Sequence, residues 1–176
     1  MHPGSIQHLG QSYRLGHLAQ RVERFQWRGR DKQDIAFSVR VRYSDHCYSV
    51  DGTPPYLAGT YATRGGRLFC PIRHGYSLSL PGLIGGLFTK PTTSVGLTYE
   101  SNWSIFRLEM TPPLRQGHRY YAFFRVKCSD GEPGRTSPYR LDLYVESAYE
   151  RDRAIHVTSH FPFGKVAERV AKGQKL

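Results

Sequence analysis

The sequence predicts an α+β fold, with an N-terminal helix packed on a mostly antiparallel, twisted β-sheet of four to six strands. Apolar residues recur at helical spacing near the N-terminus, and apolar and polar residues alternate in later stretches. The two last strand-like stretches are separated by a turn-rich segment, which indicates an antiparallel hairpin. At 176 residues, we expect a single domain over 1–176, with 1–12 and 171–176 flexible.

The first element expected is an amphipathic helix over residues 13–27. Its apolar residues fall at i, i+3, i+7 and i+10, namely Leu15, Leu18, Val22 and Phe25. Arginines occupy other positions of the same stretch, so the predicted helix has a basic side.

Residues 35–44, IAFSVRVRYS, predict a half-buried strand because apolar and polar side chains alternate throughout. Arg40 and Arg42 fall on its exposed face, one pleat apart, a spacing that suits a phosphate backbone and is also common on a solvated sheet. Farther along, Leu68 and Phe69 and the alternation that follows predict short strands interrupted at Pro71.

The segment 81–94 contains too many glycines to predict a helix. Residues 102–110 predict a strand, and 119–128, apolar on both faces, predict a central strand covered on each side. The loop 129–138 then leads into a second alternating strand from Arg140 to Glu146, which completes the hairpin. A short helix is expected near Val166 and Val170.

The charge of the chain predicts a polyanionic partner. Lys and Arg number 25 against 14 Asp and Glu, a net charge of +11 with neutral histidines and a pI of about 9.8. Three cysteines are too few for a disulfide framework, and no stretch has the apolar length of a membrane span. We therefore expect a cytoplasmic protein that binds RNA and does not enter a membrane.

The segment YSDHCYS, residues 43–49, admits three interpretations. A metal site would combine His46 and Cys47 with Cys70 and His74, but adjacent residues on a strand point to opposite faces, which disfavours it. A serine or cysteine hydrolase lacks any supporting motif. Part of an acid–base active site, in which Asp45 orients His46 and Cys47 packs inward, and an ordinary polar strand end both remain.

Metal-free phosphoryl transfer within RNA is the chemistry that the residue types favour, because it needs a base, an acid and cations. Histidine titrates near neutrality and arginine matches phosphate oxygens, and no cofactor is required. The predicted catalytic residues are His46, His74, Arg125, Ser147 and Tyr149. The predicted nucleic-acid-binding residues are Arg40, Arg42, Arg73, Arg151, Tyr48 and Tyr144.

Arg125 lies in the strand expected to be covered, so its guanidinium needs an anionic partner. A phosphate and a salt bridge to Asp45, Asp142 or Glu146 are equally open. His46 and His74 are expected to act as base and acid only if they meet in space.

The order of elements, with the pair RYYAFFRVKC and YRLDLYVESAY before a basic tail, resembles the RelE and barnase/EndoU/colicin-like group of small RNase toxins. The resemblance spans about residues 35–155. It implies metal-free RNA cleavage on an antiparallel sheet, with roles carried over to His46, His74, Arg125, Ser147, Tyr149 and Arg151.

Together these features predict an RNA-binding, metal-independent endoribonuclease, a toxin or defence effector of a bacterial or phage mobile element. Transfer RNA or ribosome-associated RNA is the expected target, with a cognate antitoxin or another protein as a further partner. The alternative is a non-enzymatic module that binds nucleic acid or inhibits another protein.

Overall fold

The computed structural model describes residues 4–29, 32–53, 55–100, 102–107, 110, 113–129 and 139–174. The predicted loop 129–138 lies outside these ranges except for Ser129. The strands are β1 Ser5–His8, β2 Gln11–Arg14, β3 Arg21–Arg28, β4 Asp34–Tyr43, β5 Ser49–Val50, β6 Leu68–Phe69, β7 Ser94–Thr98, β8 Trp103–Arg107, β9 Arg119–Cys128, β10 Tyr139–Arg151 and β11 Val157–Pro162. The helices are α1 Pro71–Ser77, α2 Leu80–Thr89 and α3 Phe163–Ala171, with short 3-10 turns η1 Gly16–Leu18 and η2 Asp45–Cys47.

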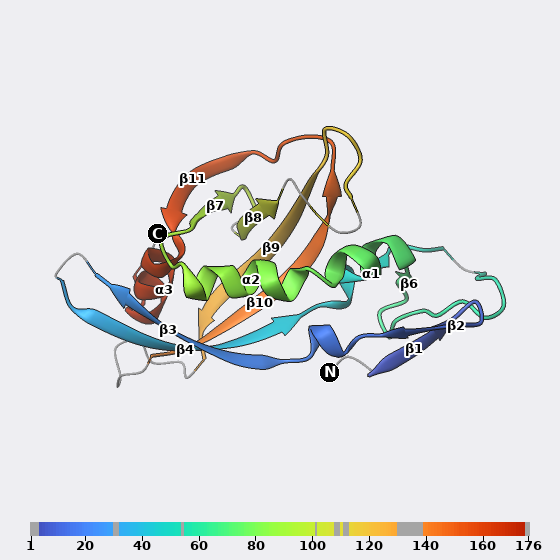
Figure 1. The fold of residues 1–176 in the computed structure, drawn as a ribbon, viewed down its shortest axis with the longest axis horizontal. Helices are drawn as coiled ribbons and strands as arrows, with labels where there is room; N and C mark the ends of the chain where they lie inside the picture. The colour runs from blue at the N-terminus through green and yellow to red at the C-terminus, as the bar shows by residue number, and fades with distance from the viewer. Residues whose placement is uncertain are drawn as a thin grey trace.

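A mixed sheet of seven strands dominates the fold, in the order β11-β7-β8-β9-β10-β4-β3 (Figure 1). β10 pairs with β4 in parallel, and the other pairs in this sheet are antiparallel. The predicted fold class is therefore wrong in three respects. The described part is mostly β, its main sheet has seven strands, and its first element is the strand β1 where a helix was expected.

The predicted helix over residues 13–27 is replaced by a strand, a 3-10 turn and a longer strand, β2, η1 and β3. In β3 the inward positions alternate and include Phe25, whereas Val22 is 60% exposed. The helical spacing depended on Val22, so it was a coincidence.

The described chain begins with a β-hairpin of β1 and β2. Its turn, Leu9 and Gly10, has positive φ at both residues, as a type I′ turn requires.

Two helices occupy the region where short strands and a glycine-rich loop were expected. Pro71 begins α1 at its first turn, where a missing N–H costs nothing, and does not interrupt a strand. In α2, Leu80, Leu83, Ile84, Leu87 and Phe88 are buried along one stripe. This packing stabilises α2 despite its glycines, because tertiary contacts outweigh helix propensity.

The strands predicted from alternation are present as β4 and β10, a strand lies within 102–110 as β8, and β9 and β10 pair as an antiparallel hairpin. β9 is central, but its side chains are not covered on both faces throughout, since Arg125 and Lys127 are exposed. The weak C-terminal helix is α3, which is amphipathic and buries Phe163 and Val166.

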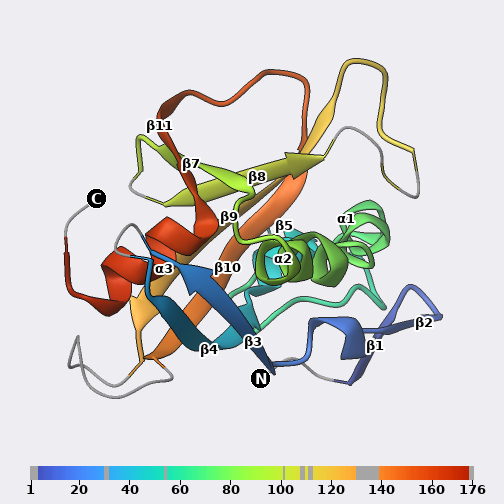
Figure 2. The same ribbon diagram turned by 60° about the vertical axis from the view of Figure 1, so that its left-hand side comes forward.

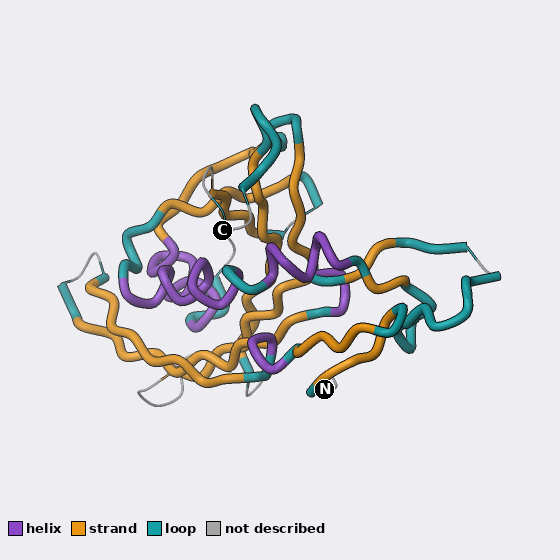
Figure 3. The backbone as a smooth tube through the Cα atoms, turned by 45° about the vertical axis from the view of Figure 1, so that its right-hand side comes forward, coloured by secondary structure: helices purple, strands orange, loops and turns teal. Residues whose placement is uncertain are grey.

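The sheet curves around the helices, so that β3 and β4 lie on one side of them and β7, β8 and β11 on the other (Figures 1 and 3). Figure 2 shows α2 and α3 packed on the same concave face. The core fills this face, with Val39, Leu143 and Phe124 from the central strands meeting Ile84 and Phe163 from the helices. The opposite, convex face of β3, β4, β10 and β9 carries no helix in the described part of the chain.

Within the described ranges, no helix has both the length and the apolar character needed to cross a lipid bilayer.

Candidate functional site

A β-bulge in β10 shapes the convex face. Val145 pairs with Phe124 and Ser147 with Phe123, so Glu146 is an extra residue opposite no partner on β9. The bulge places two consecutive side chains, those of Glu146 and Ser147, beside the same pocket. Strand alternation alone would have sent them to opposite faces.

The end of β4 supports this bulge. The Ser44 N–H donates to the Val145 carbonyl at 2.9 Å, and the Ser44 hydroxyl donates to the Glu146 carbonyl. The same hydroxyl accepts a hydrogen bond from the His46 N–H at 3.1 Å and so caps η2. This 3-10 turn presents His46 on the surface while Cys47 is fully buried.

The turn between β7 and β8 forms the third wall. Asn102 is 5% exposed, and its amide donates to Glu146 Oε2 at 3.1 Å while its carbonyl oxygen accepts from the Thr98 hydroxyl. Glu146 Oε1 lies 2.8 Å from Arg125 Nε. Both oxygens of the Glu146 carboxylate therefore have partners. Arg125 forms a salt bridge to Glu146, one of the partners that the sequence left open for it.

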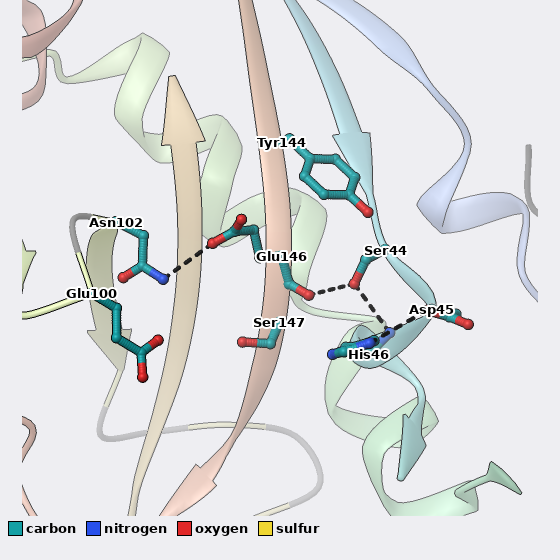
Figure 4. A pocket seen from close by; sticks show the side chains of 8 residues that line it. All are labelled: Ser44, Asp45, His46, Glu100, Asn102, Tyr144, Glu146 and Ser147. Carbon is teal, nitrogen blue, oxygen red and sulfur yellow. Dashed lines mark hydrogen bonds and ion pairs between the residues drawn. The ribbon is translucent and has the colours of Figure 1, made fainter. Parts of the chain in front are cut away.

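These three segments enclose a shallow cavity of about 370 Å³. Figure 4 shows its side chains in front of the strands, with the helices behind. The lining residues are all polar or aromatic: Ser44, Asp45, His46, Glu100, Asn102, Tyr144, Glu146 and Ser147. His46 Nε2 lies 3.9 Å from Asp45 Oδ1, so the predicted orientation of His46 by Asp45 is compatible with this geometry.

Exposed cations extend along the convex face from the pocket toward the opposite ends of the strands. They are Arg24 and Arg28 on β3, Arg40 and Arg42 on β4, Arg125 and Lys127 on β9, and Arg140 on β10. Strand register arranges some of them in rows. In one row Asp142 of β10 lies between Arg40 and Lys127, and in the next Tyr144 lies between Arg42 and Arg125. The guanidinium carbon of Arg42 is 5.7 Å from the centre of the Tyr144 ring.

An aromatic cluster continues the face beyond the bulge. Tyr149 stacks on Phe123 with ring centres 5.4 Å apart, and Phe123 stacks on Tyr121 at 6.0 Å. The guanidinium carbon of Arg73 is 5.1 Å from the Tyr149 ring centre. Arg73 also donates to the Ser49 carbonyl at 2.7 Å and to the His46 carbonyl at 3.3 Å, so it ties α1 to η2.

The two histidines predicted as base and acid belong to different clusters. His46 lines the pocket, whereas His74 Nε2 donates to the Arg14 carbonyl at 2.9 Å. The His74 ring also contacts those of Tyr13 and His17 at 5.3 and 5.4 Å. Among the described residues, His74 therefore secures the N-terminal hairpin against α1 and contributes nothing to the pocket lining.

Two further residues lie away from the surface. Tyr48 is 2% exposed, so its ring is not on the surface where the predicted stacking on bases would take place. Burial raises the pKa of the Cys47 thiol to about 12, which keeps it protonated and unreactive at neutral pH. In the part of the chain that the structure describes, no group of three or more His, Cys, Asp or Glu side chains is arranged to hold a metal ion.

Of the other predicted residues, Ser147 and Tyr144 line the pocket with His46, and Arg125 borders it through Glu146. Arg151 is half-buried at the end of β10. Sequence reasoning did not assign Glu100 or Asn102, whose only signal was a polar turn between two strands, and it named Glu146 only as a possible partner of Arg125. Nothing local in the sequence marks the bulge.

The salt bridge between Arg40 and Asp142 makes stability depend on pH. Arg40 donates to both carboxylate oxygens, at 2.5 and 2.6 Å, and these hydrogen bonds hold the pKa of Asp142 below its usual value. The bridge therefore stabilises the fold fully above the unfolded pKa of about 3.9 and is lost as the pH falls through the lower folded pKa.

We expect Asp142→Asn to lower the free energy of unfolding by about 1 kcal/mol at pH 7 and by nothing measurable at pH 2. Urea titrations at both pH values measure this difference. The control is Asp34→Asn, whose partner Arg28 lies 4.0 Å away with both side chains mostly exposed, and a few tenths of a kcal/mol are expected there. An equal loss at both pH values would contradict the assigned role of the charge.

Fold and site together define a mostly β protein whose curved mixed sheet presents a polar pocket within a basic convex face. The chain belongs to the YjaZ family, whose model matches residues 5–171. No curated protein and no solved structure matches the chain. Nothing in these comparisons links it to the small RNase toxins, so that resemblance stays a prediction, and the absent N-terminal helix removes part of its basis.

Proposed function

We propose that this protein binds single-stranded RNA along the convex face of its seven-stranded sheet. The observation that supports the proposal most strongly is the row in which Tyr144 lies between Arg42 and Arg125, beside the row that holds Arg40 and Lys127. The rows are two residues apart, about 6.6 Å along a strand. Cations at this spacing can contact successive phosphates of an extended strand.

The aromatic side chain in this row favours unpaired bases over a duplex. Tyr144 is 38% exposed, and its ring lies beside the Arg42 guanidinium. A base stacked on such a ring contributes about 1–3 kcal/mol, and only a single strand leaves base faces free to stack. The net charge of +11 adds long-range attraction for the polyanion.

Fluorescence anisotropy with a labelled twelve-nucleotide RNA tests the proposal. We expect Arg42→Ala to weaken binding about tenfold and to reduce the slope of log K against log salt by about 0.7, the value for one lost phosphate contact. Tyr144→Ala is expected to weaken binding by a similar factor with little change in slope, because stacking releases no counterion.

The matched control is Lys90→Ala, which removes an exposed cation at the C-terminal end of α2, away from the convex face. Its affinity should equal that of the unaltered protein. Absence of RNA binding, or equal losses in Lys90→Ala and Arg42→Ala, would overturn the proposal.

Metal-independent RNA cleavage is a second candidate, favoured by the presence of His46, Glu146 and Ser147 in one pocket. In such a step the 2′-oxygen attacks phosphorus and the 5′-oxygen leaves, which gives a 2′,3′-cyclic phosphate and a free 5′-hydroxyl. Glu146 would take the proton from the 2′-hydroxyl, and protonated His46 would give one to the leaving oxygen. This assignment replaces His74 by Glu146.

Incubation with total RNA and transfer RNA in excess chelator tests this candidate. Cleavage that disappears in His46→Ala and persists in His74→Ala would support it, since His74 lies outside the pocket lining. Bound but intact RNA in every lane would leave binding as the function.

A further inference from the structure

The pocket at the bulge differs in charge from the face around it. Three carboxylates, those of Asp45, Glu100 and Glu146, line it together with a single imidazole. We propose that this pocket binds a nucleobase and selects guanine, an inference that rests on the RNA-binding function proposed above.

A base fits this pocket better than a phosphate does, so this inference belongs with the binding function and is an alternative to the cleavage candidate. Carboxylates repel phosphate oxygens and accept hydrogen bonds from the N–H groups of bases. Two of the lining side chains, Tyr144 and His46, have flat rings that can contact a base, and His46 is about half exposed. The cations that extend from the pocket would hold the phosphates while the base enters it.

Guanine matches a carboxylate better than the other bases do. Its Watson–Crick edge carries two adjacent donors, N1–H and the N2 amino group, which suit the two oxygens of one carboxylate. Adenine and cytosine each place an amino donor beside an acceptor nitrogen. Uracil has its single N–H between two carbonyl oxygens, which a carboxylate repels.

Glu100 is the carboxylate placed to make this contact. Glu146 already accepts from Asn102 and pairs with Arg125, and Asp45 faces His46. Glu100 is exposed and has no hydrogen bond or ion pair to the described residues. Asn102, also in the pocket lining, is buried and donates to Glu146.

A second feature of the same turn points to a bound base. Tyr99, the residue before Glu100, is 86% exposed, the highest value among the large apolar side chains described. An exposed tyrosine beside a polar pocket offers a stacking surface for a neighbouring base.

The experiment compares four seven-nucleotide RNAs that differ only in a central G, A, C or U within oligo(U). Each carries 2′-O-methyl groups, which prevent attack by the 2′-oxygen. We expect the G-containing RNA to bind about tenfold more tightly than the U-containing one, since a good bidentate contact gives discrimination of this order. Inosine at the centre, which lacks the N2 amino group, should lose most of that preference.

Glu100→Gln should reduce the preference for G to about twofold or less while oligo(U) binding remains, because the carboxamide supplies one acceptor in place of two. Asp152→Asn is the control, an exposed carboxylate beyond β10 that does not line the pocket, and it should keep the preference.

Three results overturn the inference. Equal binding of all four RNAs would remove the guanine site, and a preference for G that survives Glu100→Gln would refute the assignment of the contact to Glu100; in both cases the RNA-binding function stands. No binding of any RNA would refute the binding function and the pocket assignment together.

Discussion

Replacing Phe163 by alanine should lower the free energy of unfolding by about 3–5 kcal/mol, the largest effect that we expect from a single substitution. Phe163 is fully buried at the start of α3. Its ring centre lies 5.5 Å from that of Phe25, 5.6 Å from Phe88 and 6.4 Å from Phe124. One side chain thus joins α3 to β3, α2 and β9. Urea titration followed by circular dichroism measures the loss.

A graded series keeps this prediction testable even if the alanine variant does not fold. Phe163→Leu should cost less than Phe163→Ala, because it leaves a smaller cavity. Phe161→Ala is the matched control two residues earlier, where the ring is only partly buried and packs on Trp103 with centres 6.0 Å apart. If Phe161→Ala destabilises as much as Phe163→Ala, the position assigned to the core is wrong.

The second large effect is expected from Gly164→Ala, at about 2–3 kcal/mol of destabilisation. A Cβ at this position would lie 2.1 Å from Cε3 of Trp27, far inside contact distance. Trp27 cannot move freely, because its indole N–H donates to Glu168 Oε2 at 3.1 Å. The expected result is a lower melting temperature with unchanged RNA affinity while the protein is folded.

Gly82→Ala should change the free energy of unfolding in the opposite direction. A Cβ at Gly82 meets nothing within 4 Å, and this glycine is exposed in α2, so alanine should stabilise the helix by about 0.5–1 kcal/mol. A double-mutant cycle of Gly164→Ala with Trp27→Leu completes the test. The smaller leucine side chain should relieve most of the clash with the Cβ added at position 164, so the double variant should be more stable than the sum of the two single effects. Additive effects on the free energy of unfolding would contradict a clash with Trp27.

These two predictions and those on RNA concern opposite faces of one sheet. Phe163 and Gly164 act where the concave face meets the helices, whereas Arg42 and Tyr144 project from the convex face. Successive residues of a strand alternate between the faces, so the same strands build the core and present the cations. Stability and RNA affinity should therefore change independently in the two sets of variants.

Period-two alternation predicted the strands well where one face is buried and the other charged. β4 and β10 show it clearly, and both were expected from sequence. Helical spacing gave a wrong prediction for β3, because Val22 is an exposed apolar residue that completed a false helical spacing. The sequence also did not predict α2, because its glycines argued against a helix whose buried stripe is stabilised by the packing of Ile84 and Leu87 in the core.

The site was predicted in part. His46, Ser147 and Tyr144 are in the pocket, and Arg125 has a carboxylate partner that was considered in advance. His74, predicted as the acid or base beside His46, is not among the residues that line the pocket. Its position depends on α1, which the sequence did not predict.

Composition and local pattern were enough to establish the positive charge, the polar segment at the end of β4 and the hairpin of β9 and β10, because each depends on neighbouring residues. The parallel pairing of β4 with β10, the bulge at Glu146 and the pocket came only from the folded chain. The hydrogen bond from Ser44 to Glu146 joins residues 102 positions apart, and such contacts follow from how the whole core packs.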